Sequence, residues 1–314
     1  MSEAPLPVTP ARRRHPRVGY AMAAGAALIW AVNGTVSKVI LASGISSLRL
    51  SQVRMTGALI GFVLVLLVTA PDRLRVRRRE LPILVVWGIG GLAFVQWFYF
   101  LAIHRLAIGV ALLIEYVAPL IVALIARYVF HEHVRRRIWV ALAFAIAGVA
   151  LIVNVRHGGT ISTPGVVFAL ASAAAYTFYI LLAERAVGGR DAVSLLAWGF
   201  GFGALFWCFV APWWSFPAGR VGADVSLLGH LSDYHLPVWA LMAFVIVIGT
   251  IVPFFLLVSA LRHLSATRVG IIAMLEPVGA TIVAWAWLNE SLGTLQLVGA
   301  AIVLCAIVLA QTAR

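Results

Sequence analysis

Four of the ionisable side chains inside the long apolar runs of this sequence are candidates for chemistry. Glu115 lies within GVALLIEYVAPL, Glu276 precedes a proline in a later run, and Lys38 and Arg54 lie in the first two runs. An ionisable side chain at the centre of a bilayer costs from about 3 kcal/mol upward, so it needs a function or a partner. A carboxyl group removed from water favours its neutral form. Glu115 is therefore our first candidate for carrying a proton or binding an ammonium group, and a buried structural ion pair is the alternative.

The two cations are candidates for binding a carboxylate. Lys38 is the only lysine in a chain with 23 arginines, and it follows Asn33, which we place in the same candidate site. Arg54 and Glu115 fall at a comparable depth in their runs. Either cation could hold the carboxylate of Glu115 or that of a bound molecule. Lys38 could instead extend its ammonium group to the membrane interface.

Glu276 is the second candidate for a titrating group, because of the proline that follows it. Pro277 has no N–H, so the carbonyl group of Ala273 loses its usual helical donor. Inside a membrane, such broken backbone belongs beside a cavity. Pro277, Pro119 and Pro253 are therefore candidate hinges, and kinks without a functional role are the alternative.

Amphipathic side chains in the same runs could line a pocket beside these charges. The candidates are Gln96, Trp97, Tyr99, Tyr116, Tyr176 and Tyr179. Aromatic residues also serve as interfacial belts or as packing, which is the alternative for each of them. Glu132 and Glu290 fall at the edges of runs, where an acid favours the N-terminus of the next helix, so we expect them to cap helices.

The sequence contains no recognisable catalytic or cofactor motif. His131 and His133 flank Glu132, but this spacing is not the i, i+4 spacing of a zinc-binding helix. There is no phosphate-binding loop of the kind that ATP-driven proteins use. We therefore expect no metal, no cofactor and no enzymatic activity.

The elements that position these residues follow from composition. Of the 314 residues, 63% are apolar and 11% are charged, whereas soluble domains contain about 25% charged residues. Long continuous apolar runs exclude a water-soluble globule and an outer-membrane barrel, whose strands alternate. The net charge of +13 lies mostly in short segments between the runs, so it indicates membrane orientation and not a nucleic-acid partner.

Ten apolar runs are long enough to form membrane-spanning helices. A hydrocarbon core of about 30 Å needs about 20 residues per helix. The sequence therefore predicts an all-α integral membrane protein with ten transmembrane helices. The predicted spans are 19–41, 48–70, 81–102, 107–129, 137–154, 164–184, 191–213, 237–260, 266–288 and 293–312.

The distribution of Lys and Arg predicts the orientation of these spans. When the connections are assigned alternately to two sides, one side collects 16 of these residues and the other collects 4. By the positive-inside rule, both termini are expected to be cytoplasmic. Residues 1–18 are then a cytoplasmic tail, and the long connection 214–236 is an external loop.

The sequence contains an internal repeat. A shift of 158 residues places Pro119 and Glu132 on Pro277 and Glu290, and the interval is 13 residues in both copies. We assign residues 19–155 and 156–314 to two repeats of five spans each. Because five is odd, the second repeat must be inverted relative to the first. Such a chain encloses a site near the midplane by itself, so we expect a functional monomer.

The chain resembles the drug/metabolite transporter superfamily of the EamA type. The segments PLIVALIARYVFHE and PVGATIVAWAWLNE carry this resemblance, and residues 81–124 are similar to bacterial threonine/homoserine exporters. The chain departs from many members in that Ala118 stands opposite Glu276. The resemblance implies proton-driven efflux of amino acids or related metabolites across the bacterial inner membrane. Drug or nucleotide-sugar transport is one alternative, and a membrane-embedded enzyme or channel is another.

Overall fold

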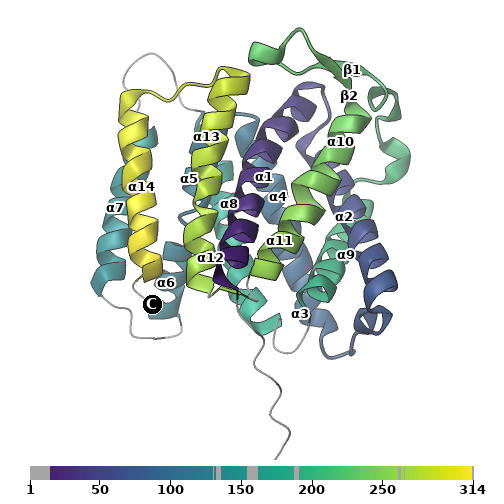
Figure 1. The fold of residues 1–314 in the computed structure, drawn as a ribbon, viewed down its shortest axis with the longest axis horizontal. Helices are drawn as coiled ribbons and strands as arrows, with labels where there is room; N and C mark the ends of the chain where they lie inside the picture. Colours follow the sequence, from purple (N-terminus) through teal and green to yellow (C-terminus); the bar gives the residue numbers. More distant parts are fainter. Residues whose placement is uncertain are drawn as a thin grey trace, which may run out of the picture.

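The computed structural model describes residues 15–129, 131, 136–153, 162–186, 191–260, 263–264 and 266–312. Most of the predicted tail and Glu132 lie outside these residues. The described chain is a bundle of roughly parallel and antiparallel helices with one small sheet at one end (Figure 1). The first helix begins at Pro16, slightly before the predicted start of the first span.

Helices occupy all ten of the predicted intervals. In the first half they are α1 (Pro16–Ala42), α2 (Ser47–Thr69), η1 (Pro71–Leu74), α3 (Leu81–Val86), the π-helical η2 (Trp87–Ala93), α4 (Phe94–Ile103), α5 (Ile108–Glu115), α6 (Ala118–Tyr128) and α7 (Arg136–Val153). In the second half they are α8 (Thr163–Ala186), α9 (Ala192–Val210), α10 (Val238–Ile246), the π-helical η6 (Val247–Ile251), α11 (Val252–Ala260), α12 (Ala266–Ala273), α13 (Leu275–Leu288) and α14 (Thr294–Thr312).

Six helical stretches within the described ranges are long and apolar enough to cross a membrane. They are Pro16–Ala42, Ser47–Thr69, Leu81–Ile103, Val193–Val210, Val238–Leu257 and Ile271–Leu288. Ile108–Val122 and Thr294–Leu309 are shorter apolar helices. The part of the chain that the structure describes thus supports a multi-pass helical membrane protein, and the number of ten spans stays a prediction.

The connection 214–236 corrects the expectation of a purely helical chain. Its short elements are η3 (Trp213–Ser215), η4 (Ala218–Arg220), β1 (Asp224–Ser226), η5 (Gly229–Leu231) and β2 (His235–Pro237). The two strands pair antiparallel, with Val225 opposite Leu236. Strands form here because this polar segment lacks an apolar helical run. The sheet lies at the opposite end of the bundle from the start of α1 and the end of α14 (Figure 1).

Helices are interrupted at matching places in the two halves. The fourth predicted span is divided after Glu115, and the ninth is divided after Ala273, which is 158 residues later. The third and eighth spans each contain a π-helical segment, η2 and η6. Pro119, Pro277 and Pro253 lie near the starts of α6, α13 and α11, where a missing N–H disrupts the helix least. The prolines therefore mark places where helices restart.

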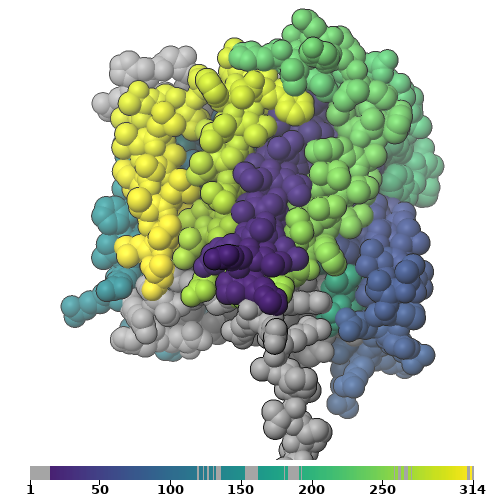
Figure 2. Space-filling view, viewed as in Figure 1, coloured from purple at the N-terminus to yellow at the C-terminus, as the bar shows by residue number. Residues whose placement is uncertain are grey.

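The two halves pack against each other through equivalent helices. Helix α1 packs against α11 and α13, and α8 packs against α4 and α5. Figure 2 shows α1, in purple, between the green and yellow-green helices of the second half. Helices α2 and α9 also pack together, with Gly203 against Met55 and Gly201 against Leu59. Because the contacting residue number falls along α9 as it rises along α2, these two helices are antiparallel.

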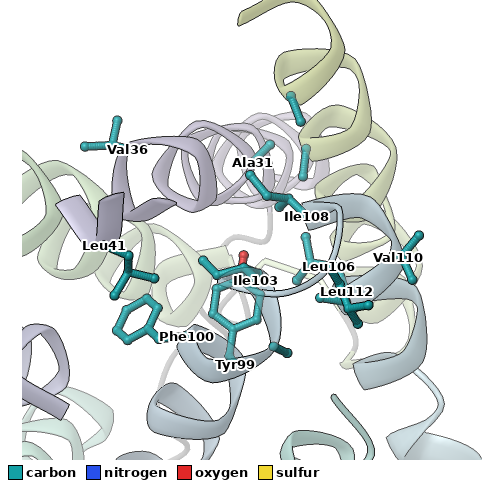
Figure 3. Packing of buried hydrophobic residues seen from close by; sticks show 14 of the residues in the cluster. Ala31, Val36, Leu41, Tyr99, Phe100, Ile103, Leu106, Ile108, Val110 and Leu112 are labelled. Atoms are coloured by element: carbon teal, nitrogen blue, oxygen red, sulfur yellow. The ribbon is translucent and has the colours of Figure 1, made fainter. Parts of the chain in front are cut away.

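Buried apolar side chains form two main clusters. One surrounds α1, α4 and α5 and includes Leu41, Phe100 and Ile108 (Figure 3). The other lies between α2, η2 and α9 and includes Trp87 and Phe200. Large apolar side chains also cover the outer surface, among them Val68, Phe209, Trp214 and Trp285. An outer surface of this kind matches a lipid environment and not water.

Helices α7 and α14 approach each other through two glycines. A Cβ atom at Gly148 would lie 2.8 Å from the carbonyl oxygen of Gly299, and one at Gly299 would lie 2.7 Å from the carbonyl oxygen of Gly148. Contacts of Gly148 with Val303 and of Ile152 with Gly299 show that these helices are antiparallel. Any side chain at either glycine must push the backbones apart.

We therefore predict that Gly148→Leu lowers the free energy of unfolding by about 1–3 kcal/mol, as overpacking of a tight interface does. The measurement is thermal unfolding of the purified protein in detergent. Gly219→Leu is the matched control, because no atom lies within 4 Å of a Cβ atom at Gly219. Equal melting temperatures for wild type and Gly148→Leu would contradict the close contact.

Candidate functional site

Tyr116 connects the interrupted helices of the two halves. It lies directly after α5, and its Oη is 2.7 Å from Oε2 of Glu276 and 3.1 Å from the carbonyl oxygen of Ala273. Pro277 cannot donate to this carbonyl group. The Tyr116 hydroxyl group is therefore the donor available to it, and the same hydroxyl group contacts the partly buried Glu276.

Glu115 is buried at the end of α5 and contacts the other half of the chain. Its Oε2 accepts a hydrogen bond from the hydroxyl group of Ser172 on α8. Ser172 Oγ is also 3.1 Å from the carbonyl oxygen of Val95. Each candidate acid thus shares one hydroxyl group with a backbone carbonyl group, and in both cases the hydroxyl group belongs to the opposite half from the acid.

Arg54 is buried, and its guanidinium group is held by the interrupted part of the eighth span. Nε donates to Oγ1 of Thr250 at 2.6 Å, and Nη2 donates to the carbonyl oxygen of Gly249 at 3.2 Å. Pro253 lacks the N–H that would serve the Gly249 carbonyl group in a regular helix. The guanidinium group also lies 5.7 Å from the ring centroid of Phe100. These contacts fix its orientation.

The positive charge of Arg54 is close enough to act on both candidate acids and on Tyr99. Within the described ranges, however, no carboxylate forms an ion pair with it, and its Nη1 has no hydrogen-bond acceptor. One edge of the guanidinium group is therefore available for an anion. A carboxylate is the anion whose shape best matches that edge.

Further polar side chains surround this charge. Figure 3 shows the Tyr99 hydroxyl group pointing from α4 toward α1, and a Cβ atom at Gly34 would lie 2.7 Å from it. Asn33 is buried and packs against Gly249. Buried Oδ1 of Asn33 and Oε1 of Gln96 have no hydrogen-bond partner among the residues that the structure describes. Their hydrogen-bonding capacity is therefore unused by the described residues in this conformation.

Three of the predicted pocket residues form an aromatic series beside the acids. The rings of Tyr116 and Tyr176 are 6.5 Å apart, and those of Tyr176 and Tyr179 stack at 5.8 Å. Tyr179 in turn stacks on Trp87 at 5.2 Å. The ring of Trp97 packs against those of Phe98 and Trp207, in the same apolar cluster as Tyr179 and Trp87.

The structure also places Lys38 away from the two candidate acids. Its Nζ forms an ion pair with Glu290 and donates to the carbonyl oxygen of Leu106 at 2.9 Å. The other oxygen of Glu290 accepts from the backbone N–H of Ile108 at 3.0 Å. Glu290 therefore caps α5 of the first half, whereas its position in the sequence predicts that it caps the helix that follows it. An acid at the N-terminus of α5 is favourable in the same way.

Sequence reasoning misses several side chains of this arrangement. Ser172 and Thr250 are single hydroxyl residues within apolar runs, and nothing in their local pattern separates them from ordinary helix residues. Glu290 is separated from Lys38 by 252 residues. The repeat aligns Glu290 with Glu132, but this alignment does not identify Lys38 as the partner of Glu290.

Comparisons with known proteins agree with this architecture. A model of the EamA-like transporter family matches twice, over residues 17–154 and 163–312. The threonine/homoserine exporter RhtA of Salmonella typhimurium (strain LT2) is 27% identical over 274 residues, which are 86% of this chain and 80% of that protein. RhtA of Escherichia coli (strain K12) is 26% identical over 272 residues, with 84% and 80% covered.

The uncharacterized transporter YdfC of Bacillus subtilis (strain 168) is 24% identical over 245 residues, with 77% of this chain and 75% of that protein covered. A solved crystal structure with 17% identity has a TM-score of 0.63 and covers 93% of this chain and 96% of its own, which shows a shared fold. Because the two family matches together cover most of the sequence, the chain belongs to the EamA-like transporter family.

Proposed function

We propose that this protein is a secondary active transporter that exports amino acids or related small metabolites in exchange for protons. The RhtA exporters, whose names specify threonine and homoserine, support this class of substrate. Drug or nucleotide-sugar transport is the second possibility within the family. A membrane-embedded enzyme or channel is a weaker alternative, because the similar proteins that carry a functional name are transporters.

The observation that carries the proposal is the group formed by Glu115, Glu276 and Arg54. Two acids and one guanidinium group lie where helices of both halves are interrupted, and they interact electrostatically. In this proposal Arg54 binds the substrate carboxylate through its free edge. Glu115 is the first candidate for the proton, and Glu276 is the second. Asn33, Gln96, Tyr99, Tyr116, Tyr176 and Tyr179 line the substrate pathway.

The proposal includes ten transmembrane helices in two inverted repeats. The matching helix interruptions and the antiparallel pairs α2–α9 and α7–α14 support a two-fold axis perpendicular to the helices. Two such halves can rock about a central site and open it to either side. Pro119, Pro253 and Pro277 are the hinges in this scheme. Since both repeats are in one chain, a monomer contains the whole pathway.

In the same scheme, the Lys38–Glu290 ion pair closes the pathway at the end that carries β1 and β2. It joins α1 and α5 of the first half to the segment before α14 of the second. By the charge distribution, that end faces outward and both termini face the cytoplasm of a bacterial cell. Opening outward then requires this pair to separate.

If Glu115 carries the proton, Glu115→Gln removes titration but preserves side-chain volume. We predict that proton-driven efflux of radiolabelled L-threonine from proteoliposomes falls to the background of empty liposomes, while threonine exchange persists. Glu276→Gln is tested in parallel as the second candidate. Normal flux with an unchanged pH profile in Glu115→Gln would assign the proton to Glu276 instead. If Glu115 instead belongs to a structural ion pair, Glu115→Gln should lower the free energy of unfolding by about 3–5 kcal/mol.

The orientation is tested by two single cysteines in a background without Cys208 and Cys305. Arg77 and Ala218 are both exposed and lie in connections that the charge distribution places on opposite sides. In intact cells, we predict that a membrane-impermeant thiol reagent labels Ala218→Cys and does not label Arg77→Cys. Permeabilised cells, in which both should react, are the control. The reverse pattern would overturn the orientation.

The closing role of the Lys38–Glu290 pair predicts that Glu290→Gln opens this end of the molecule. Leu106 is buried beside the pair, so Leu106→Cys should react slowly with a thiol reagent in detergent. We expect Glu290→Gln to raise that rate by about threefold to tenfold, because loss of a partly exposed ion pair makes opening easier by roughly this factor. Asp233→Asn, an exposed acid at the same end, should leave the rate unchanged. An unchanged reaction rate of Leu106→Cys in the presence of Glu290→Gln would show that the Lys38–Glu290 pair does not close this end.

A further inference from the structure

Within the described ranges, two hydroxyl groups each face one carboxylate oxygen and one backbone carbonyl oxygen at the contact between the halves. Tyr116 Oη faces Oε2 of Glu276 and the carbonyl oxygen of Ala273. Ser172 Oγ faces Oε2 of Glu115 and the carbonyl oxygen of Val95. A hydroxyl group has one proton, so it can donate to only one acceptor at a time. The protonation state of each acid therefore decides whether the hydroxyl group can donate to the neighbouring carbonyl group. The two carbonyl groups differ, because Val95 lies in α4 and keeps the helical donor Tyr99 N–H, whereas Pro277 offers no N–H to Ala273.

When Glu276 is neutral, both contacts of Tyr116 are made at once. The carboxyl group donates its proton to Tyr116 Oη, and Tyr116 donates its own proton to the Ala273 carbonyl group. When Glu276 loses its proton to water, Tyr116 turns its single proton to the carboxylate. The Ala273 carbonyl group, which Pro277 cannot serve, is then left without this donor. An unpaired carbonyl group away from water is costly, so this arrangement becomes less favourable.

The same sequence of events applies to Glu115 and Ser172. A neutral Glu115 donates to Ser172, which donates to the carbonyl group of Val95. After the proton leaves Glu115, Ser172 can serve either the carboxylate or the Val95 carbonyl group, but not both. In each case one O–H bond of the carboxyl group breaks and its proton passes to water, and no other covalent bond changes.

We propose that the conformation described here is the proton-loaded state of the transporter, and that Tyr116 and Ser172 are the positioning residues that make it depend on the protons of Glu276 and Glu115. Both hydroxyl groups lie in the opposite half from the acid they contact. Loss of either proton thus leaves the hydroxyl group with one of its two hydrogen bonds between the halves, at the contact that must change when the pathway reopens. This inference deepens the proposed function and rests on it only in the use of protons.

Other charged and titratable groups near the two acids do not replace these contacts. Arg54 on α2 acts on both acids, Tyr99 on α4 and Tyr176 on α8 lie near them, and the acids also act on each other. Lys38 on α1 is occupied by Glu290. Among the described residues, the acid oxygens have no hydrogen-bond donor besides Tyr116 and Ser172. The two hydroxyl groups are therefore the groups whose hydrogen bonds change directly when the acids gain or lose a proton.

The test measures hydrogen–deuterium exchange of the full-length protein in detergent at mildly acidic and mildly alkaline pH, corrected for the intrinsic exchange rate. In the wild type, we expect protection at the α12–α13 junction to fall by about tenfold on the alkaline side, which corresponds to about 1.4 kcal/mol for one unpaired carbonyl group. At the start of α4 we expect a smaller fall, because the Val95 carbonyl group keeps its helical donor when it loses that of Ser172. Tyr116→Phe should abolish this pH dependence at the α12–α13 junction only. Ser172→Ala should abolish it near Val95 only.

Two controls separate this role from general packing. Tyr176→Phe removes a neighbouring phenol hydroxyl group, and Thr177→Val removes a hydroxyl group on α8 that bonds only to the carbonyl groups of Ala118 and Ala173. Both should retain the wild-type pH dependence. Should Tyr116→Phe fail to fold, Glu276→Gln keeps Tyr116 in place and supplies a neutral donor, so it should also abolish the pH dependence at the junction.

The proposal is wrong if Tyr116→Phe and Ser172→Ala retain the wild-type pH dependence, or if the controls lose it equally. The exchange measurement needs no substrate. A protein that fails to transport L-threonine but shows the selective losses would therefore contradict the proposed substrate and still support the proton-loaded state. If the wild type transports threonine but the variants show no selective loss of pH dependence, the proposed substrate is supported and the proton-loaded state is contradicted.

Discussion

The structure depends on one constraint, which is that a backbone carbonyl group inside a membrane must find a donor within the protein. Regular helices meet this requirement by themselves, but helices interrupted by proline do not. Here the carbonyl group of Ala273 is served by Tyr116, and that of Gly249 by Arg54. The same interruptions that weaken the helices thus determine where a phenol and a guanidinium group must lie.

This constraint also explains why the candidate site lies between the halves. The interruptions occur at matching places of the two repeats, so the side chains that serve them come together from both. Arg54 is held by η6 of the second half, and Tyr116 of the first half reaches the start of α13. The polar groups that stabilise the interrupted helices are then the same groups that can bind a charged substrate or a proton. Under the proposed function, stability and transport depend on the same residues in this part of the molecule.

Part of this arrangement could be predicted from the sequence, and the reason for the rest is physical. Pro277 predicts the free carbonyl group of Ala273, and hydropathy predicts where the helices lie, because both depend only on local covalent structure. The partner of Lys38 could not be predicted, because Glu290 is 252 residues away and the packing of α1 against the second half decides the contact. The contacts of the Trp97 ring with Phe98 and Trp207 depend on the rotation of α4, which residue type alone does not predict. The π-helical segments η2 and η6 have no local sequence signature that would predict them.

The most direct test of the proton-coupled account is the movement of protons that accompanies the movement of substrate. Wild-type protein is reconstituted into liposomes that contain a pH-sensitive dye, and an L-threonine gradient is imposed without any pH gradient. The account predicts that threonine leaving the liposomes brings protons in, so that the interior becomes acidic, and that a variant lacking both Glu115 and Glu276 carboxyl groups shows no such change. Threonine flux at the wild-type rate with no change of internal pH would contradict it.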